Sequence, residues 1–279
     1  MHSTKPAERI FELGVELGRL CQVRLKQFDV AASRNDLYKR ATLFFFNKAF
    51  RTYGAIRVPC RANFMEDGVV LGRTLFELNM QAEWMSREPD SRAQQFFDHF
   101  PVRFYDLHWQ KKDAAARMQD DQISSMLSSL ENSPGFQAKK AAHDSLRDKF
   151  LIKRRRQMVV SEYWWRGSIY DLAKWLDKEI RERGEPDADY EWLYNFVYFH
   201  ESELTHTGTT SLPPYDFIAR EPDASSGLKQ SLDLAQLSTA RFVRTADIMQ
   251  LAWNLVLTDE IFKTRDLTEQ IYSTAYPQT

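Results

Sequence analysis

The sequence predicts an all-α fold, a single globular multi-helix domain of about eight or nine helices. Apolar residues recur at spacings of three and four along almost the whole chain, and no alternating apolar–polar stretch is long enough to build a sheet. Hydrophobic residues make up 43% of the 279 residues, which is enough for a full core, and only 10 are glycine and 10 are proline. This composition excludes fibrous and wholly disordered proteins.

The N-terminal part of the chain is expected to hold three helices. Regularly spaced apolar side chains mark the first, at Ile10, Leu13, Leu17 and Leu20. The second is predicted over residues 35–53. The third is expected to begin at Pro59, because proline suits the first turn of a helix, and to continue to Arg87 before Pro89 ends it.

Prolines and a polar stretch divide the middle of the chain. Residues 91–107 are rich in phenylalanine, and we expect an interruption at Pro101. Residues 111–131 are polar and predict an exposed helix or a mobile connection. The Ser-Pro-Gly sequence at 133–135 is a break that could divide two lobes. Because both sides of it are helical, we prefer one domain over residues 1–279.

The last part of the chain is also predicted to be helical. A basic helix is expected to end at residues 153–156, and Ser168 is placed to cap the next helix. A further helix is expected to end at about His206. Residues 207–227 form the longest irregular segment, and a final long helix is predicted over residues 228–262.

Charge and cysteine content restrict the function and the compartment. The formal net charge is -1, from 38 basic and 39 acidic residues, which argues against a general nucleic-acid binder but allows a local basic patch. Cys21 and Cys60 have no metal-ligand spacing and form no disulfide framework. We therefore expect a cytoplasmic protein, since no signal peptide is evident and no apolar stretch approaches the ~18 residues of a membrane helix.

Two charged residues fall inside the apolar stripe of the third predicted helix. With Arg73 at zero on a helical wheel, Glu77 falls near ~40°, close to Trp84 at ~20° and Met80 at ~340°, so both charges lie inside the apolar stripe and not on the solvent face. Burying two charges is costly unless they have partners. We expect them to pair with one another and with polar groups from another helix. The alternative is a buried ion pair that only fixes helix register.

A second polar strip follows Tyr190. Tyr198, Ser202 and His206 recur at a spacing of four and therefore stack along one strip of a helix. Such a row can form a proton-transfer relay, since histidine titrates near neutrality. The alternative is that the strip is the solvent side of the helix, with His206 at its C-terminus. We expect this helix to pack on the one before Arg87, so that the strip converges with Arg73 and Glu77.

A run of basic residues precedes an aromatic cluster. The run consists of Lys153, Arg154, Arg155 and Arg156, and the cluster of Tyr163, Trp164 and Trp165. Together they could hold single-stranded nucleic acid through phosphate contacts and base stacking. The alternative is a solvated helix face with the tryptophans in the core. The histidine spacings do not fit a metal-binding helix, so neither a metal nor a cofactor is expected.

The polar motifs occur in a set order along the chain. The five residues from Arg73 to Glu77 come first, Tyr190 and Tyr194 follow, and the pattern Tyr198-x3-Ser202-x3-His206 comes last. In order and spacing these motifs resemble a bacterial all-helical family catalogued as a domain of unknown function. The resemblance covers roughly residues 35–260, and it implies an all-helical fold without a settled activity. Its matching polar positions are Arg73, Glu77, Tyr198, Ser202 and His206.

A looser similarity is to helical ribonucleases of the HEPN type, which carry an Arg-x4–6-His motif. Two pairs match this spacing, Arg92 with His99 and Arg103 with His108. About one or two matches are expected by chance in such a chain, and Pro101 disturbs the helix that the motif needs. By analogy, Arg73 and His206 brought together from separate helices could serve phosphate chemistry.

Two functions of different classes remain open. The first is a metal-independent ribonuclease-like effector of defence or toxin type, in which Arg73 stabilises charge, His206 transfers protons, and Glu77, Tyr198 and Ser202 orient them. The second is a non-catalytic helical sensor or scaffold whose polar cluster is a buried structural network. The expected partners are RNA or a small-molecule ligand, and no membrane. A site open to a cleft favours chemistry, and a sealed network favours structure.

Overall fold

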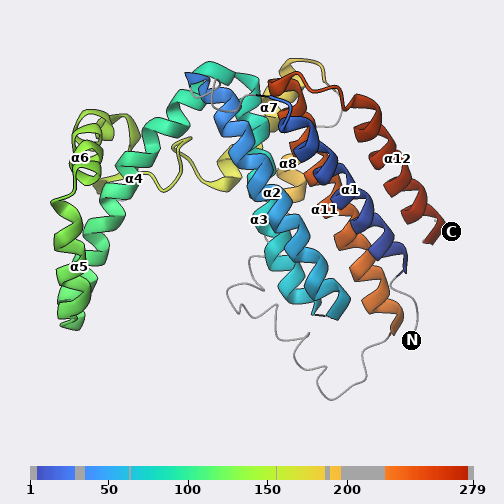
Figure 1. Ribbon diagram of the computed structural model, residues 1–279, viewed down its shortest axis with the longest axis horizontal. Coiled ribbons are helices and arrows are strands. Elements are labelled where there is room, and N and C mark those ends of the chain that lie inside the picture. Colours follow the sequence, from blue (N-terminus) through green and yellow to red (C-terminus); the bar gives the residue numbers. More distant parts are fainter. Residues whose placement is uncertain are drawn as a thin grey trace. The chain divides into compact units, whose positions relative to one another are not determined.

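The computed structural model describes residues 5–28, 35–62, 64–154, 156–185, 189–195 and 224–275. These residues form ten α-helices, one short 3-10 helix and a two-stranded antiparallel sheet (Figure 1). The predicted all-α fold class is therefore confirmed. No helix in the described ranges is both long and apolar enough to cross a bilayer.

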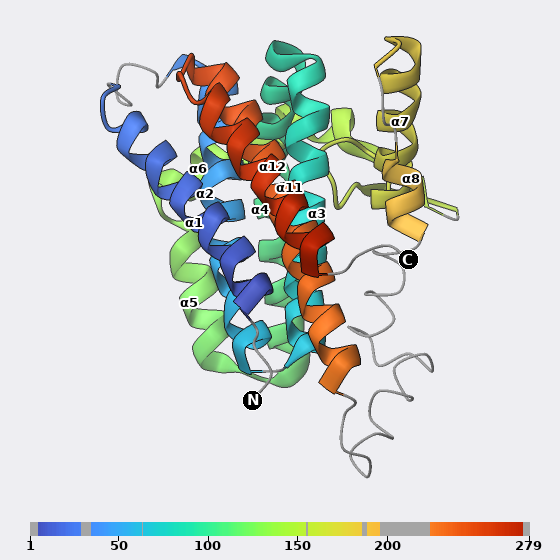
Figure 2. The same ribbon diagram turned by 90° about the vertical axis from the view of Figure 1, so that its right-hand side faces the viewer.

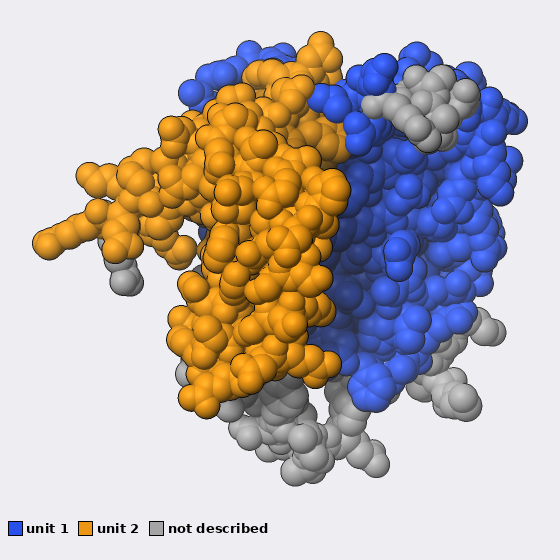
Figure 3. Space-filling model, turned by 60° about the vertical axis from the view of Figure 1, so that its left-hand side comes forward, with its two compact units in different colours: residues 1–87, 172–279 blue, residues 88–171 orange. Residues whose placement is uncertain are grey.

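The chain divides into two compact units, which are coloured separately in Figure 3. Unit 1 consists of residues 1–87 and 172–279, and unit 2 of residues 88–171. The predicted break at residues 133–135 lies inside unit 2. A single domain over the whole chain stays a prediction.

In the described residues, unit 1 is built mainly from five long helices. They are α1 (Lys5–Leu25), α2 (Leu37–Ala62), α3 (Met65–Arg87), α11 (Ala224–Trp253) and α12 (Thr258–Ala275). Helix α11 contacts each of the other four (Figures 1 and 2). Polar residues on α11 are therefore brought against several parts of the chain that are distant in sequence.

An aromatic cluster holds α11 against α1 and α2. Tyr53 of α2 stacks on Phe242 of α11 with ring centroids 5.0 Å apart, and its hydroxyl group lies 2.7 Å from that of Thr239. The Tyr53 ring also fills the space that a side chain at position 14 would need, which explains the glycine at Gly14 of α1. These contacts fix the position of α11 and of its charged residues.

The boundary between α2 and α3 differs from the prediction. Helix α2 passes through Pro59 and ends at Ala62, and α3 begins at Met65, so the prediction that Pro59 starts a helix is wrong. Ile56 and Cys60 on either side of the proline are 0% and 5% exposed. Their packing in the core outweighs the loss of one backbone N–H donor in the last turn.

Unit 2 begins with three helices. They are α4 (Pro89–Met118), α5 (Asp121–Glu131) and α6 (Pro134–Leu146). Pro89 occupies the first turn of α4, as proline prefers, and the helix continues through Pro101, so the predicted interruption there is wrong. Buried His99 and Val102 hold that region of α4 in place. The polar stretch at residues 111–131 is largely helical, which fits the first of its two predicted forms.

The basic run lies in a hairpin and not at the end of a helix. Helix α6 ends at Leu146, and the next elements are η2 (Arg147–Phe150), β1 (Leu151–Arg154) and β2 (Gln157–Val160). The prediction that the basic helix continues to residues 153–156 is therefore wrong. Strands β1 and β2 pair antiparallel with Ile152 opposite Val159. Such β-branched residues favour strands, but strands of four residues are too short to show an alternating pattern in the sequence.

Ser168 caps helix α7 (Ile169–Glu182), as predicted. Its hydroxyl group accepts a hydrogen bond from the Asp171 N–H at 3.1 Å, and the Asp171 carboxylate accepts one from the Ser168 N–H at 2.8 Å. This reciprocal pair satisfies two backbone donors at the helix start. Helix α7 begins in unit 2 and continues into unit 1, where the short α8 (Tyr190–Leu193) follows.

The long final helix predicted over residues 228–262 is wrong, because two helices occupy this part of the chain. Helix α11 ends at Trp253, and Asn254 adopts the left-handed conformation with a φ of 51°. The Leu255 N–H donates to the Gln250 carbonyl group at 2.9 Å, which completes a Schellman motif. Asparagine is one of the few residues that tolerate this conformation, so the chain turns there and α12 begins at Thr258.

Candidate functional site

A buried carboxylate on α3 is the centre of a charged network in unit 1. The side chain of Glu83 is 1% exposed. Arg244 of α11 donates to it twice, from Nε to Oε2 at 2.7 Å and from Nη2 to Oε1 at 2.9 Å. A planar guanidinium group matches a carboxylate in this two-point arrangement, and the pair therefore fixes the orientation of α11 on α3.

A second arginine completes the environment of Glu83. Arg87, one turn later on α3 and 6% exposed, donates from Nη2 to Glu83 Oε1 at 2.5 Å. Its Nη1 donates to both carboxylate oxygens of Glu185, at 2.6 and 2.7 Å. Arg87 thus joins the end of α3 to the segment that follows α7. The buried charges of Glu83 and Arg87 both have oppositely charged partners, without which their burial would be costly.

The network keeps Glu83 ionised. Burial acts to raise the pKa of the Glu83 carboxyl group, but the hydrogen bonds and charges of Arg244 and Arg87 outweigh it and hold that pKa below its usual range. Arg244 has a further contact on its exposed side, because its Nη1 donates to Asp247 Oδ2 at 2.9 Å. The Arg244 side chain is 43% exposed, so the network reaches the surface at this residue.

Two aromatic rings and a third arginine lie beside the network. The Arg241 guanidinium group of α11 lies 5.3 Å from the ring centroid of Phe76 on α3 and 5.7 Å from that of Tyr190 on α8. The faces of aromatic rings attract a cation, so this arrangement stabilises Arg241 in a region of low polarity. Burial raises the pKa of the Tyr190 hydroxyl group to about 12, which keeps that group neutral.

Asp177 of α7 fixes the start of α8. Its carboxylate accepts hydrogen bonds from the backbone N–H groups of Tyr190 at 2.8 Å and of Glu191 at 2.9 Å. Asp177 is 3% exposed, so it acts as a buried cap supplied by another helix. This contact holds the Tyr190 ring in place against Phe76 and Arg241.

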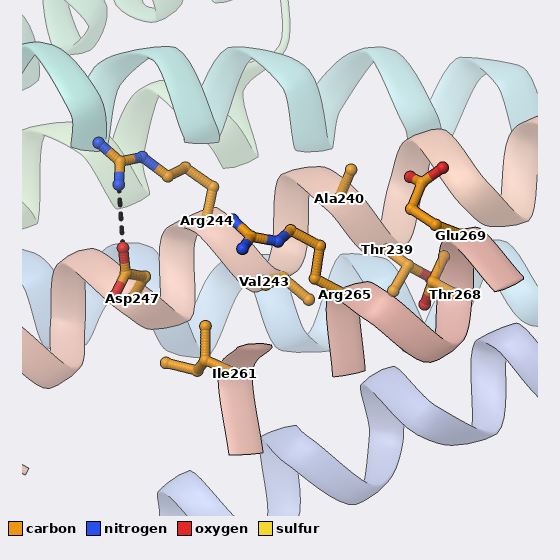
Figure 4. Close-up of a pocket in the computed structure, with 9 residues that line it drawn as sticks. All are labelled: Thr239, Ala240, Val243, Arg244, Asp247, Ile261, Arg265, Thr268 and Glu269. Carbon is orange, nitrogen blue, oxygen red and sulfur yellow. Dashed lines mark hydrogen bonds and ion pairs between the residues drawn. The ribbon is translucent and has the colours of Figure 1, made fainter. Parts of the chain in front are cut away.

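A pocket of about 210 Å³ lies between α11 and α12 (Figure 4). It is lined by Thr239, Ala240, Val243, Arg244, Asp247, Ile261, Arg265, Thr268 and Glu269. The Arg265 side chain extends toward Arg244, and Asp247 and Glu269 lie at opposite ends of the row of lining residues (Figure 4). The pocket therefore combines charged groups of both signs with an apolar wall, and Arg244 belongs both to the pocket and to the buried network.

The structure describes two of the five residues of the predicted catalytic cluster. Arg73 Nε donates to Glu77 Oε1 at 3.3 Å along α3, and the two side chains are 20% and 24% exposed. The pairing of these two residues is as expected. Their side chains are neither fully buried nor fully exposed to solvent. Tyr198, Ser202 and His206 lie outside the described residues, so the convergence of the five side chains stays a prediction.

The predicted nucleic-acid-binding run is exposed on the hairpin of unit 2. Lys153 and Arg154 belong to β1 and Arg156 follows it, whereas Arg155 lies outside the described residues. The neighbouring rings are less accessible: Trp164 and Trp165 are 4% and 3% exposed. These tryptophans belong to the core of unit 2, so they offer no open face for base stacking.

Both Arg-x4–6-His pairs lie on α4, and the analogy with HEPN-type ribonucleases is not confirmed. The ring of His99 lies 3.0 Å from the Ser161 carbonyl oxygen, and burial lowers the pKa of His99. The ring of His108 lies 2.9 Å from Glu131 Oε1. The two residues are 7% and 4% exposed, and both histidines hold parts of unit 2 together.

Glu83, Arg87 and Arg244 were not identified from the sequence. The helical wheel that singles out Arg73 also places Glu83 near ~280° and Arg87 near ~320°, on the apolar face beside Phe76 at ~300°. That signal was sufficient to find the two residues on α3. Arg244 is 161 positions from Glu83, and no local pattern connects them.

Among the described residues, no three histidine, cysteine, aspartate or glutamate side chains are grouped so that they could hold a metal ion. The described residues offer charge pairing, cation–π contact and a pocket between α11 and α12.

The model of a family described as "Family of unknown function (DUF5677)" matches residues 39–225. No curated protein matches the chain, and no solved structure does.

Proposed function

The chain belongs to this family of unknown function, and we propose that it is a non-catalytic helical sensor whose small-molecule ligand binds between α11 and α12. One observation carries the proposal: Arg244 lines the pocket and also donates two hydrogen bonds to buried Glu83. A ligand in the pocket contacts the residue that joins α11 to α3. Binding is thereby linked to the stability of the helix bundle.

The charged network supports a structural role in preference to catalysis. Both carboxylate oxygens of Glu83 accept hydrogen bonds from arginine, and the pKa of that carboxyl group lies below its usual range. A general acid or base works best when its pKa lies near the operating pH. Glu83 is therefore suited to hold two helices together and not to transfer protons near neutrality.

The charges of the pocket favour a small zwitterion as ligand. Arg265 can bind a carboxylate, Glu269 can bind an ammonium group, and Val243 belongs to the apolar wall. A volume of about 210 Å³ corresponds to about seven water molecules at ~30 Å³ each. An apolar amino acid of the size of valine or leucine matches both the charges and the volume.

Calorimetric titration tests this proposal. We expect L-valine or L-leucine to bind and to raise the melting temperature, and isovalerate and isobutylamine, which each lack one charge, to bind at least tenfold more weakly. Arg265→Gln should abolish binding. Lys263→Gln is the matched control, because Lys263 is an exposed cation on the same helix and does not line the pocket. Absence of amino-acid binding, or equal loss in both variants, would reject the sensor.

The second candidate function is the metal-independent ribonuclease-like effector of defence or toxin type. The partial exposure of Arg73 and Glu77 favours it, because a reacting phosphate needs access to the cation. In this proposal Arg73 stabilises charge, His206 transfers protons, and Glu77, Tyr198 and Ser202 orient these groups. RNA would be held in addition by the basic run at residues 153–156.

Expression in host cells separates the two candidates. If the chain is a ribonuclease, the wild type should slow growth and degrade cellular RNA, while Arg73→Ala and His206→Ala should not. Lys263→Gln should behave as the wild type. Intact RNA in cells that express folded wild-type protein contradicts the ribonuclease and leaves the sensor in place.

A further inference from the structure

An open groove runs along α2 beside α3, on the side of α2 away from Tyr53. Six of the residues that line the groove lie on one face of α2, and the seventh lies on α3. They are Phe44, Asn47, Lys48, Arg51, Thr52, Ala55 and, on α3, Leu71. Its volume is about 590 Å³. This is within the range of about 300–1,000 Å³ that small-molecule sites occupy.

The charged side chains of the groove are all positive. Lys48 and Arg51 are exposed, and neither has an ion pair with any residue that the structure describes. By contrast, Arg57 and Arg61, farther along the same helix, both pair with Glu8 of α1. The groove therefore presents two cations that the described chain does not neutralise, and an anion is the complementary ligand.

An aromatic ring stands next to these cations. The Phe44 side chain is 47% exposed, and Lys48 Nζ lies 5.9 Å from its ring centroid. Phe44 and Arg51 are two helical turns apart, about 10 Å along the axis, with Lys48 between them. A flat group stacked on Phe44 can thus carry an anionic group that reaches Lys48 and Arg51.

We propose that this groove binds a mononucleotide. The phosphate group lies between Lys48 and Arg51, the base stacks on Phe44, and the Asn47 amide group is placed to hydrogen-bond the edge of the base. Among the residues that line the groove, the cations are Lys48 and Arg51, which lie about one helical turn apart, so the groove accommodates one phosphate and not a continuous strand. This inference is independent of the pocket between α11 and α12.

Calorimetric titration of the full chain with AMP and with UMP tests the proposal. We expect both nucleotides to bind, and adenosine and ribose 5-phosphate, which lack the phosphate and the base respectively, to bind at least tenfold more weakly. Raising the salt concentration from 50 to 300 mM should weaken AMP binding severalfold, because the phosphate contacts are exposed.

A pair of matched variants tests the location. The double variant Lys48→Gln/Arg51→Gln should lose AMP binding at least tenfold, and Phe44→Ala should lose it to a similar extent. The double variant Arg19→Gln/Lys263→Gln removes the same charge from exposed positions on α1 and α12 and should bind as the wild type. All the substituted side chains are exposed, so circular dichroism should show unchanged folding.

Three results would overturn the proposal. The first is no binding of AMP or UMP by the folded wild type. The second is equal weakening in the two double variants, which would show a general effect of charge. The third is tight binding of a labelled single-stranded RNA without binding of either mononucleotide, which would identify a macromolecular partner. None of these results bears on amino-acid binding between α11 and α12.

Discussion

The guanidinium group of Arg244 donates two hydrogen bonds to the carboxylate of Glu83, at 2.7 and 2.9 Å, and so joins α11 to α3 across 161 positions of sequence. The acceptor is buried and the donor is partly exposed. A change at either residue should therefore affect helix packing, but a change at Glu83 should have the larger effect, because it leaves Arg87 buried without its partner on α3.

Replacement of Glu83 by alanine should lower the free energy of unfolding by about 3–5 kcal/mol, the usual cost of removing one partner of a buried ion pair. Glu77→Ala is the control on the same helix. Its pair with Arg73 is partly exposed, so its loss should cost about 1 kcal/mol or less. Urea denaturation followed by circular dichroism measures both values. Equal costs for the two variants would contradict the structural role of the network.

The acid sensitivity of the fold should depend on Glu83. Its pKa is lower in the folded than in the unfolded chain, so its contribution to stability is complete above the unfolded value of about 4.3 and is lost as the pH falls through the folded value. Urea midpoints measured between pH 6 and pH 3 should fall more steeply for the wild type than for Glu83→Gln. Parallel curves would show that the carboxyl group has the same pKa in both states.

Removal of the Asp177 carboxylate should loosen the start of α8. Asp177→Ala leaves the N–H groups of Tyr190 and Glu191 without their acceptor and should cost about 1–2 kcal/mol. Asp177→Asn keeps one acceptor and should cost less. Hydrogen exchange at the two amides gives a local measurement, and unchanged protection in Asp177→Ala would exclude the capping role.

The two cysteines should be unreactive in the folded protein. Burial raises the pKa of Cys21 to about 12 and that of Cys60 to about 11, and the two residues are 0% and 5% exposed. Because the thiolate is the reactive form, a disulfide reagent at pH 8 should modify them only as fast as the protein opens. In urea both should react at once. Rapid reaction of the native protein would show that one of these helices opens readily.

Helical periodicity identified most of the elements, because each long helix has a buried stripe that repeats along the sequence. The helix boundaries that were predicted wrongly each depend on a particular residue. Pro59 and Pro101 suggested boundaries, but core packing on both sides keeps the chain helical there. The turn at Asn254 was passed over because the apolar pattern continues on both sides of it, while the left-handed conformation depends on a single residue.

Only part of the candidate site could be predicted from the sequence. A helical wheel finds charges on an apolar face of one helix, and it found Arg73 and Glu77. It cannot name the partner that another helix supplies, so Arg244 became evident only from the packing of α11 on α3. The hairpin that carries Lys153 and Arg154 was missed for a different reason, since its short strands are determined by their pairing and not by a repeat.

The ion pair between Arg87 and Glu185 also has a consequence for the folding pathway. These residues are 98 positions apart, and the loop that their contact closes contains all of unit 2. Closing a flexible loop of this length costs about 4 kcal/mol in chain entropy. If residues 88–171 become compact first, fewer free residues remain in the loop and its closure is less costly. The rate at which unit 1 assembles should therefore depend on how early unit 2 folds, and substitutions that slow the folding of unit 2 should delay the formation of the ion pair between Arg87 and Glu185.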